Sequence, residues 1–203
     1  MLERLDPVVY AQDTGPPPLP AALVEQYRQQ GYILLEQFFC EQEVALWLAE
    51  LDRLRKDERM QKLDETITEP DSLAVRSIFA VHKLSPMMGN LSRDPRLLRI
   101  AQYLLDDKVY MHQSRLNYKP GFRGKEFYWH SDFETWHVED GMPGMRALSM
   151  SITLTENFST NGPLLLIPGS HRKFLACEGE TPEQHFKSSL KKQDYGVPDD
   201  RNL

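Results

Sequence analysis

The sequence is poor in cysteine, in long apolar runs and in clustered positive charge, and each shortage excludes a class of protein. Its two cysteines, Cys40 and Cys177, lie far apart in unrelated contexts, which fits neither a disulfide framework nor a zinc knuckle. No stretch approaches the roughly 18 apolar residues of a membrane span, and the start has no apolar core of a signal peptide. A net charge of −6 without a Lys/Arg cluster argues against a nucleic-acid partner. We therefore expect a soluble cytoplasmic protein.

The composition and length are those of one globular domain. Hydrophobic residues make up 40% and charged residues 27% of the 203 residues, which is enough for a sizeable core. Residues 1–19 are predicted to form an arm, because Gly15 is followed by three prolines that cannot enter a helix or a central strand. The single domain is expected to span residues 20–203.

The first half of this domain has helical patterns. A helix is predicted from Pro20 to Gln30, with Gly31 as its stop, and a longer one from about Glu41 to Arg55. A third follows Asp94, which is a capping residue with proline directly after it. Residues 56–72 are expected to be a loop, and residues 73–84 fit either a helix or a strand.

The second half has strand patterns. Besides a short early strand at residues 32–35, we expect strands at 109–119, 125–132, 146–155 and 164–167. Segment 146–155 is the clearest, because leucine, methionine and isoleucine alternate with serine and threonine. Helices followed by antiparallel strands predict an α+β fold, with helices packed on a β-sandwich or barrel.

A candidate metal site lies in the stretch FYWHSDFETWHVEDGMPGMR, residues 127–146. In an extended segment, His130 and Asp132 project to the same side, about 6.5–7 Å apart along the strand. One imidazole and one carboxylate are two of the three ligands of a 2-His-1-carboxylate site for non-heme Fe(II). His171 is a candidate third ligand, and a rival site could be built from His137 and Glu139.

A row of polar side chains lies upstream of this pair. If residues 109–119 are extended, one face carries Gln113, Arg115, Asn117 and Lys119. This face is either the wet side of an outer strand or the lining of a polar cavity for an anionic ligand. In the second case Lys119 would pair with a carboxylate, and the two amides would hydrogen-bond a small polar substrate. Trp136 adds an aromatic ring suited to a cationic or delocalised ligand.

The run from Phe127 to Ile152, with HQSRLNYKPGF upstream and NGPLLLIPGSH downstream, closely resembles the ectoine hydroxylases. These form part of the phytanoyl-CoA dioxygenase-like group of oxygenases that depend on Fe(II), 2-oxoglutarate and O₂. The resemblance extends over most of the chain from about residue 20. It implies a double-stranded β-helix (jelly-roll, cupin-like) core with N-terminal helices packed outside. It also implies hydroxylation of L-ectoine to 5-hydroxyectoine, with release of succinate and CO₂, and it favours a homodimer.

The resemblance assigns roles to individual residues. His130 and Asp132 match the Fe(II) ligands, and Gln113 matches the ectoine-binding glutamine. Lys119 matches a 2-oxoglutarate contact, and Asn117 lies in the same cosubstrate region. Positions beside the substrate are matched by Thr135 and Trp136. No general base is assigned, because the metal carries the oxidative chemistry.

The sequence departs from the family pattern at its end. In the family the distal iron-binding histidine and the arginine for 2-oxoglutarate come later than Leu203, and the histidine of the PGSH turn is not a ligand. His185 lies in a charged, helix-like context. We therefore expect a C-terminally truncated domain. Two alternatives stay open: a jelly-roll fragment that binds a small polar ligand without turnover, and a related oxygenase acting on another small zwitterion.

Overall fold

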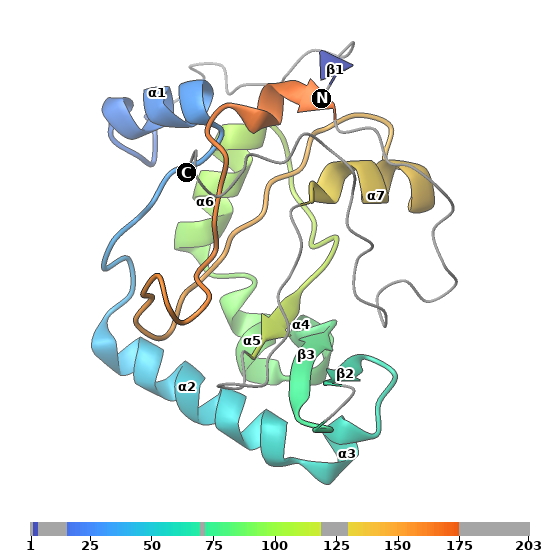
Figure 1. Ribbon diagram of the computed structural model, residues 1–203. Helices are drawn as coiled ribbons and strands as arrows, with labels where there is room; N and C mark the ends of the chain where they lie inside the picture. Colours follow the sequence, from blue (N-terminus) through green and yellow to red (C-terminus); the bar gives the residue numbers. More distant parts are fainter. Residues whose placement is uncertain (1, 4–15, 70–71, 119–129, 175–203) are drawn as a thin grey trace.

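Helices and short strands make up the regular structure of the computed structural model, which describes residues 2–3, 16–69, 72–118 and 130–174. Within these residues, no helix has the length and apolar character needed to cross a membrane. Figure 1 shows the elements in chain order: β1 (Leu2–Glu3), α1 (Ala21–Gln30), α2 (Glu41–Lys56), α3 (Glu58–Gln61), β2 (Thr66–Thr68), β3 (Val75–Phe79), α4 (Val81–Leu84), α5 (Pro86–Leu91), α6 (Pro95–Leu105), β4 (Arg115–Asn117), α7 (Asp132–Glu139), the 3₁₀ turn η1 (Ser170–Arg172) and β5 (Lys173–Phe174).

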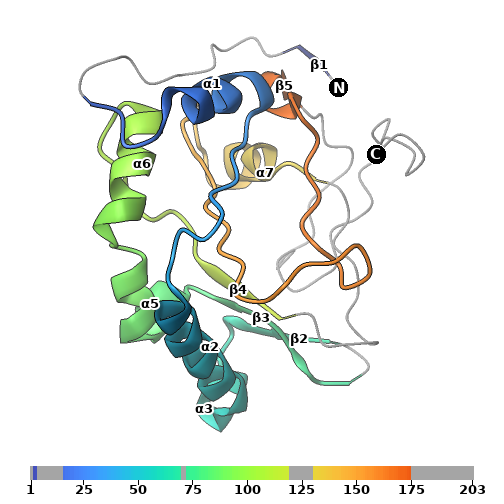
Figure 2. The ribbon, with the colours of Figure 1, turned by 90° about the vertical axis from the view of Figure 1, so that its left-hand side faces the viewer.

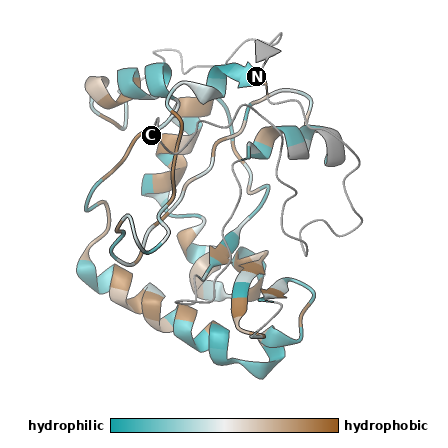
Figure 3. Cartoon of the chain, viewed as in Figure 1, coloured by the Kyte–Doolittle hydropathy of each residue, from teal (hydrophilic) through white to brown (hydrophobic). Residues whose placement is uncertain are grey.

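The three helices predicted from the sequence are confirmed. Helix α1 ends at Gly31, which has the left-handed conformation (φ 82°) that glycine adopts without strain. Helix α6 begins after Asp94, whose side chain accepts a hydrogen bond from the Arg96 amide. Along α2 and α6, hydrophobic and hydrophilic residues alternate with the turns of the helix (Figure 3). Local signals therefore sufficed for these helices.

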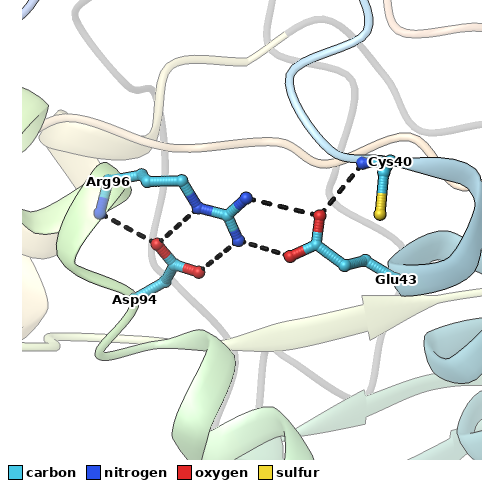
Figure 4. A network of polar contacts seen from close by, with 4 residues as sticks. All are labelled: Cys40, Glu43, Asp94 and Arg96. Atoms are coloured by element: carbon cyan, nitrogen blue, oxygen red, sulfur yellow. Dashed lines mark hydrogen bonds and ion pairs between the residues drawn. The ribbon is translucent and has the colours of Figure 1, made fainter.

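The start of α2 is tied to the start of α6 by ion pairs around Arg96 (Figure 4). The Arg96 guanidinium donates to Glu43 Oε1 at 2.5 Å and to Asp94 Oδ2 at 2.6 Å. Glu43 also accepts from the Cys40 amide at 3.0 Å, which closes a capping box at the N-terminus of α2. The hydrogen bonds from Arg96, and then that from Cys40, lower the pKa of Glu43 to about 2.

This pKa predicts an acid-sensitive contribution to stability. Because the folded pKa of Glu43 lies below its ordinary value of 4.5, the contribution is complete above pH 4.5 and is lost as the pH falls towards 2. We expect Glu43→Gln to be less stable than the unmodified chain at pH 6, with the difference shrinking between pH 4.5 and 2.5. Urea unfolding at several pH values measures this difference.

The matched control is Glu41→Gln, which removes the same charge from the same turn of α2 without touching Arg96. It should leave the pH dependence of unfolding close to that of the unmodified chain. A Glu43→Gln deficit that stays constant down to pH 2.5 would refute the assignment to this ion pair.

Two apolar clusters make up the core. One is formed around α2, β3, α4 and α5 and includes Trp47, Leu54 and Ile78, of which the last two are fully buried. The other joins α1 to α6 through Val24, Ile100 and Leu104 and includes Leu19. The end of the predicted arm therefore packs into the core, while residues 4–15 lie outside the described part.

A three-stranded antiparallel sheet packs beside α2, with strand order β2-β3-β4 (Figure 2). It confirms the α+β class, and it corrects two local expectations. The predicted loop 56–72 contains α3 and β2, and the ambiguous stretch 73–84 contains both β3 and α4. Met60 explains the first correction, because its burial gives α3 an apolar anchor within a polar stretch. The jelly-roll core itself is not visible among the described residues.

Three predicted strands are wrong as strands. The structure assigns no β-ladder to residues 32–35, 146–155 or 164–167, and only Arg115–Asn117 of the predicted strand 109–119 is paired. The alternation of side chains still holds in part: Leu148 and Leu154 each pack against an apolar cluster. A sequence pattern selects the face that is buried, whereas a ladder also requires a neighbouring backbone in register.

The PGSH turn docks on the C-terminal end of α1. The Gly169 amide donates to the Gln30 carbonyl at 2.8 Å, and Arg172 Nη2 donates to the Arg28 carbonyl at 2.9 Å. These donors satisfy carbonyls that have no partner within the helix, where a cation is also favoured by the helix dipole. The His171 ring lies directly over Gly31. The chain then continues into β5, which pairs with β1.

Candidate metal and substrate site

His130 and Asp132 lie together at the start of α7, at the end of the molecule away from α2 (Figure 1). Their nearest atoms, His130 Nε2 and Asp132 Oδ1, are 3.3 Å apart. Two ligands that each bind one metal ion at about 2.1 Å, at a right angle, lie roughly 3 Å from one another. The two side chains are therefore spaced as two ligands of one ion, and the imidazole–carboxylate donor set suits Fe(II).

The local backbone differs from the one expected. The extended segment 125–132 was predicted to include Asp132, but Asp132 is the first residue of α7, and Ser131 is its extended N-cap (φ −110°, ψ 136°). Residues 119–129 lie outside the described part. Asp132 and Glu134 place negative charge in the first turn of α7, where the helix dipole favours it. The direction of the Asp132 carboxylate is therefore set by the start of a helix, and not by the alternation of side chains along a strand.

The environment of Asp132 favours its ionised form. Its surroundings disfavour charge by desolvation, but the hydrogen bond with His130 and the charges of His130 and Arg115 outweigh this effect. A weak hydrogen bond from Ser149 Oγ, at 3.4 Å, acts in the same direction. The pKa of Asp132 is consequently held below its usual range. An ionised carboxylate at neutral pH is the form that a metal ion requires.

The polar row, which runs through β4, has the predicted alternation of side chains in its described part. From residue 113 to 118, exposed and half-buried residues alternate, and Leu116 and Tyr118 pack into the apolar cluster beside α2. Gln113 and Asn117 are exposed on the other face, and Asn117 Oδ1 accepts a hydrogen bond from Ser77 Oγ at 2.8 Å. Arg115, which shares this face, acts electrostatically on Asp132. Lys119 lies outside the described residues.

Trp136 lies in a helix and not in the extended run expected for it. It belongs to α7, four positions after Asp132. Positions i and i+4 share a helix face, so the two side chains stay neighbours. The Trp136 ring packs edge-to-face on His112, with centroids 5.1 Å apart. Thr135 lies in the same helix, and its side chain is not described.

Two other candidate histidines, His137 and His171, make contacts elsewhere. His137 Nδ1 donates to the Met142 carbonyl at 2.6 Å, which directs this ring towards the loop after α7. His171 packs on Gly31 at the end of α1. His82 has a structural role: its Nδ1 bonds Ser114, and its pKa is lowered by burial and by nearby Lys83 and Arg93. Among the described residues, no group of three His, Cys, Asp or Glu side chains could hold a metal.

Comparison with known proteins decides the family. The model of the family described as phytanoyl-CoA dioxygenase (PhyH) matches residues 27–200. The chain belongs to the phytanoyl-CoA dioxygenase family. The matched range contains the polar row, the His130–Asp132 pair and α7. Every candidate site residue named above therefore lies within the range that the family model matches.

Relatives within the phytanoyl-CoA dioxygenase family include proteins named ectoine dioxygenase. The one from Bordetella bronchiseptica is 59% identical over 203 residues, which cover 100% of this chain and 66% of that protein. The one from Sphingopyxis alaskensis is 56% identical over the same length. The chain thus spans just under two thirds of the length of these relatives.

Solved structures of the Sphingopyxis alaskensis protein EctD are similar to this fold. The structure with 2-oxoglutarate and 5-hydroxyectoine has a TM-score of 0.83 and 54% identity, covering 87% of this chain and 63% of that one. The structure with bound Fe has a TM-score of 0.80 and 55% identity, covering 85% and 61%. This agreement supports the helices and the sheet, which the sequence analysis had only partly predicted.

Two residues beside the candidate pair were not assigned to it from the sequence. The sequence places Arg115 in the polar row, and the structure adds its electrostatic action on Asp132. Ser149 belongs to the polar side of segment 146–155, and the structure adds its hydrogen bond to Asp132. Alternation along the segment predicts that Ser149 shares a face with Ser151 and Thr153. Only the folded chain brings Ser149 to Asp132.

Proposed function

We propose that this chain contributes the metal and substrate residues of an oxygenase that hydroxylates L-ectoine to 5-hydroxyectoine. The reaction would consume 2-oxoglutarate and O₂ and would release succinate and CO₂. The observation that supports it best is the 3.3 Å spacing of His130 Nε2 and Asp132 Oδ1 beside the polar face of β4. The names of the most similar relatives point to the same substrate.

In this proposal His130 and Asp132 hold Fe(II), and the third ligand lies outside the described residues. Bound Fe(II) would supply the oxidising chemistry, with positions left for 2-oxoglutarate and O₂. The protein's own residues bind and orient the reactants. Lys119 pairs with a carboxylate of 2-oxoglutarate and Asn117 lines the same region.

The substrate side of the site would be formed by Gln113, Thr135 and Trp136. Gln113 is exposed and offers both a donor and an acceptor to a small zwitterion. The Trp136 ring provides a face for the delocalised cation of ectoine. Ectoine would therefore lie between the polar row and the face of α7 that also carries Asp132.

The proposal extends to architecture and setting. The complete fold would contain a jelly-roll core, with α1, α2 and α6 packed outside it. Residues 20–203 would form one domain preceded by an arm at 1–19. The assembled protein would be a cytoplasmic homodimer. These statements rest on the family resemblance and on the similarity to the solved EctD structures.

The decisive experiment measures succinate formed from 2-oxoglutarate with Fe(II), with and without ectoine. It is run on this chain and on the chain extended with the remaining third of the Sphingopyxis alaskensis protein. We expect ectoine to stimulate succinate formation by the extended protein. A folded, iron-loaded extended protein that another small zwitterion stimulates and ectoine does not would refute the substrate. Ectoine binding by both forms with no succinate from either would instead support a non-catalytic binding protein.

A further inference from the structure

His112, which has no role in the proposed site, connects the segment before β4 to α7 and its C-cap through a ring contact and a hydrogen bond. The His112 ring packs on the Trp136 ring at 5.1 Å with an interplanar angle of 70°. On its other side, His112 Nε2 lies 3.1 Å from Asp140 Oδ2. Because a carboxylate only accepts, the imidazole N–H donates in this bond.

Asp140 is itself bound to the backbone of Trp136. The Asp140 amide donates to the Trp136 carbonyl at 3.0 Å, and the Met142 amide donates to the same carbonyl at 3.1 Å. The imidazole of His112 therefore contacts the Trp136 side chain and also the residue that holds the Trp136 carbonyl. The His112 side chain is 29% exposed and that of Asp140 is 50% exposed, so the hydrogen bond between them lies at the surface.

His112 is also the residue directly before Gln113. Its ring contacts the Trp136 indole on α7, and Gln113 follows it in the chain. One residue thus adjoins, through its ring and through its backbone, two residues that the proposed function assigns to the substrate.

We propose that His112 is a positioning residue: held by its hydrogen bond to Asp140, it fixes the orientation of the Trp136 indole, which the proposed function places against the substrate. The clamp is a property of the fold, whereas its effect on ectoine rests on the proposed function. The hydrogen bond to Asp140 orients the imidazole, and an edge-to-face pair worth about 0.5–1.5 kcal/mol then favours one orientation of the indole.

The first test needs no ligand. The indole N–H resonance of Trp136, assigned by its loss in Trp136→Phe, is followed in the ¹H–¹⁵N spectrum of the chain. We expect His112→Ala to shift or broaden this resonance and to leave that of Trp47 in place. His112→Phe keeps the ring contact and should largely restore the Trp136 position. Met111→Ala, at an exposed neighbouring residue, is the matched control and should change neither resonance.

The second test titrates ectoine against the same resonance. We expect His112→Ala and Asp140→Ala to weaken ectoine binding by about fivefold to tenfold. In a Trp136→Phe background the effect of His112→Ala should be smaller, because the two residues act as a unit. A failure of the proposed function would appear as no ectoine binding by the unmodified chain, with the first test still positive. A Trp136 resonance that stays in place in His112→Ala would overturn the clamp itself.

Discussion

His130→Ala and Asp132→Ala should each reduce Fe(II) affinity and ectoine-dependent succinate formation by more than about 100-fold. Either change leaves one ligand where two side chains now lie 3.3 Å apart. Removing a residue that only hydrogen-bonds a metal ligand weakens metal affinity or activity by roughly 10- to 100-fold. Removal of the ligand itself should therefore exceed that range. The measurements are Fe(II) binding by this chain, and succinate formation by the extended protein.

The matched control is His137→Ala, which removes an imidazole from the same helix. Because His137 is bound to the Met142 carbonyl, we expect the variant to keep Fe(II) binding within a few-fold of the unmodified chain. Circular dichroism of each variant verifies that α7 and the rest of the chain are folded. Loss of iron in His137→Ala with retention in His130→Ala would favour the rival site and remove the assignment made here.

Gly31→Ala should lower the free energy of unfolding by about 2–4 kcal/mol, which is the largest effect we expect away from the metal site. Two causes add. Gly31 has a φ of 82°, which a residue with a Cβ adopts only with strain. A Cβ at this position would also lie 2.3 Å from His171 Nδ1, well inside contact distance. Either His171 moves, or the PGSH turn separates from the end of α1.

Three variants separate the two causes. Gly169→Ala has a similar φ of 78° with no atom within 4 Å of the added Cβ, so it should show the strain alone, about 1–2 kcal/mol. Gly144→Ala also has open space around the added Cβ, and its backbone is not in the left-handed region, so its stability should hardly change. Gly31→Ala combined with His171→Ala should remove the steric clash and retain the strain. Urea or thermal unfolding measures all four, and equal losses for Gly31→Ala and Gly169→Ala would contradict the clash.

The helices were predictable because their signals are local. Asp94 and the proline after it mark the start of α6, and Gly31 marks the end of α1, each within one turn of the chain. The same reasoning did not predict α3, where the apolar anchor Met60 depends on distant partners, or the six-residue α5, although Ser85 and Pro86 mark its start. Propensity is a weak guide for elements of four to six residues, because burial of a few side chains outweighs it.

The candidate site was predicted in its residues more than in its geometry. The alternation along residues 113–118 could be predicted from the sequence, because strand geometry alone dictates which side chains share a face. The start of α7 at Asp132 could not, since the run from His130 fits an extended segment equally well. The metal and substrate roles of His130, Asp132 and Gln113 stay predictions that the experiments above test.

By itself, the sequence determined the helices that carry their own caps, the polar and apolar faces of the extended segments, and the family motif. Only the tertiary structure decided that Asp132 begins a helix, that His171 closes the end of α1, and that His112 contacts Trp136. The physical reason is the range of the interactions. Capping and alternation act between residues a few positions apart, whereas these contacts join segments that meet only when the chain has folded.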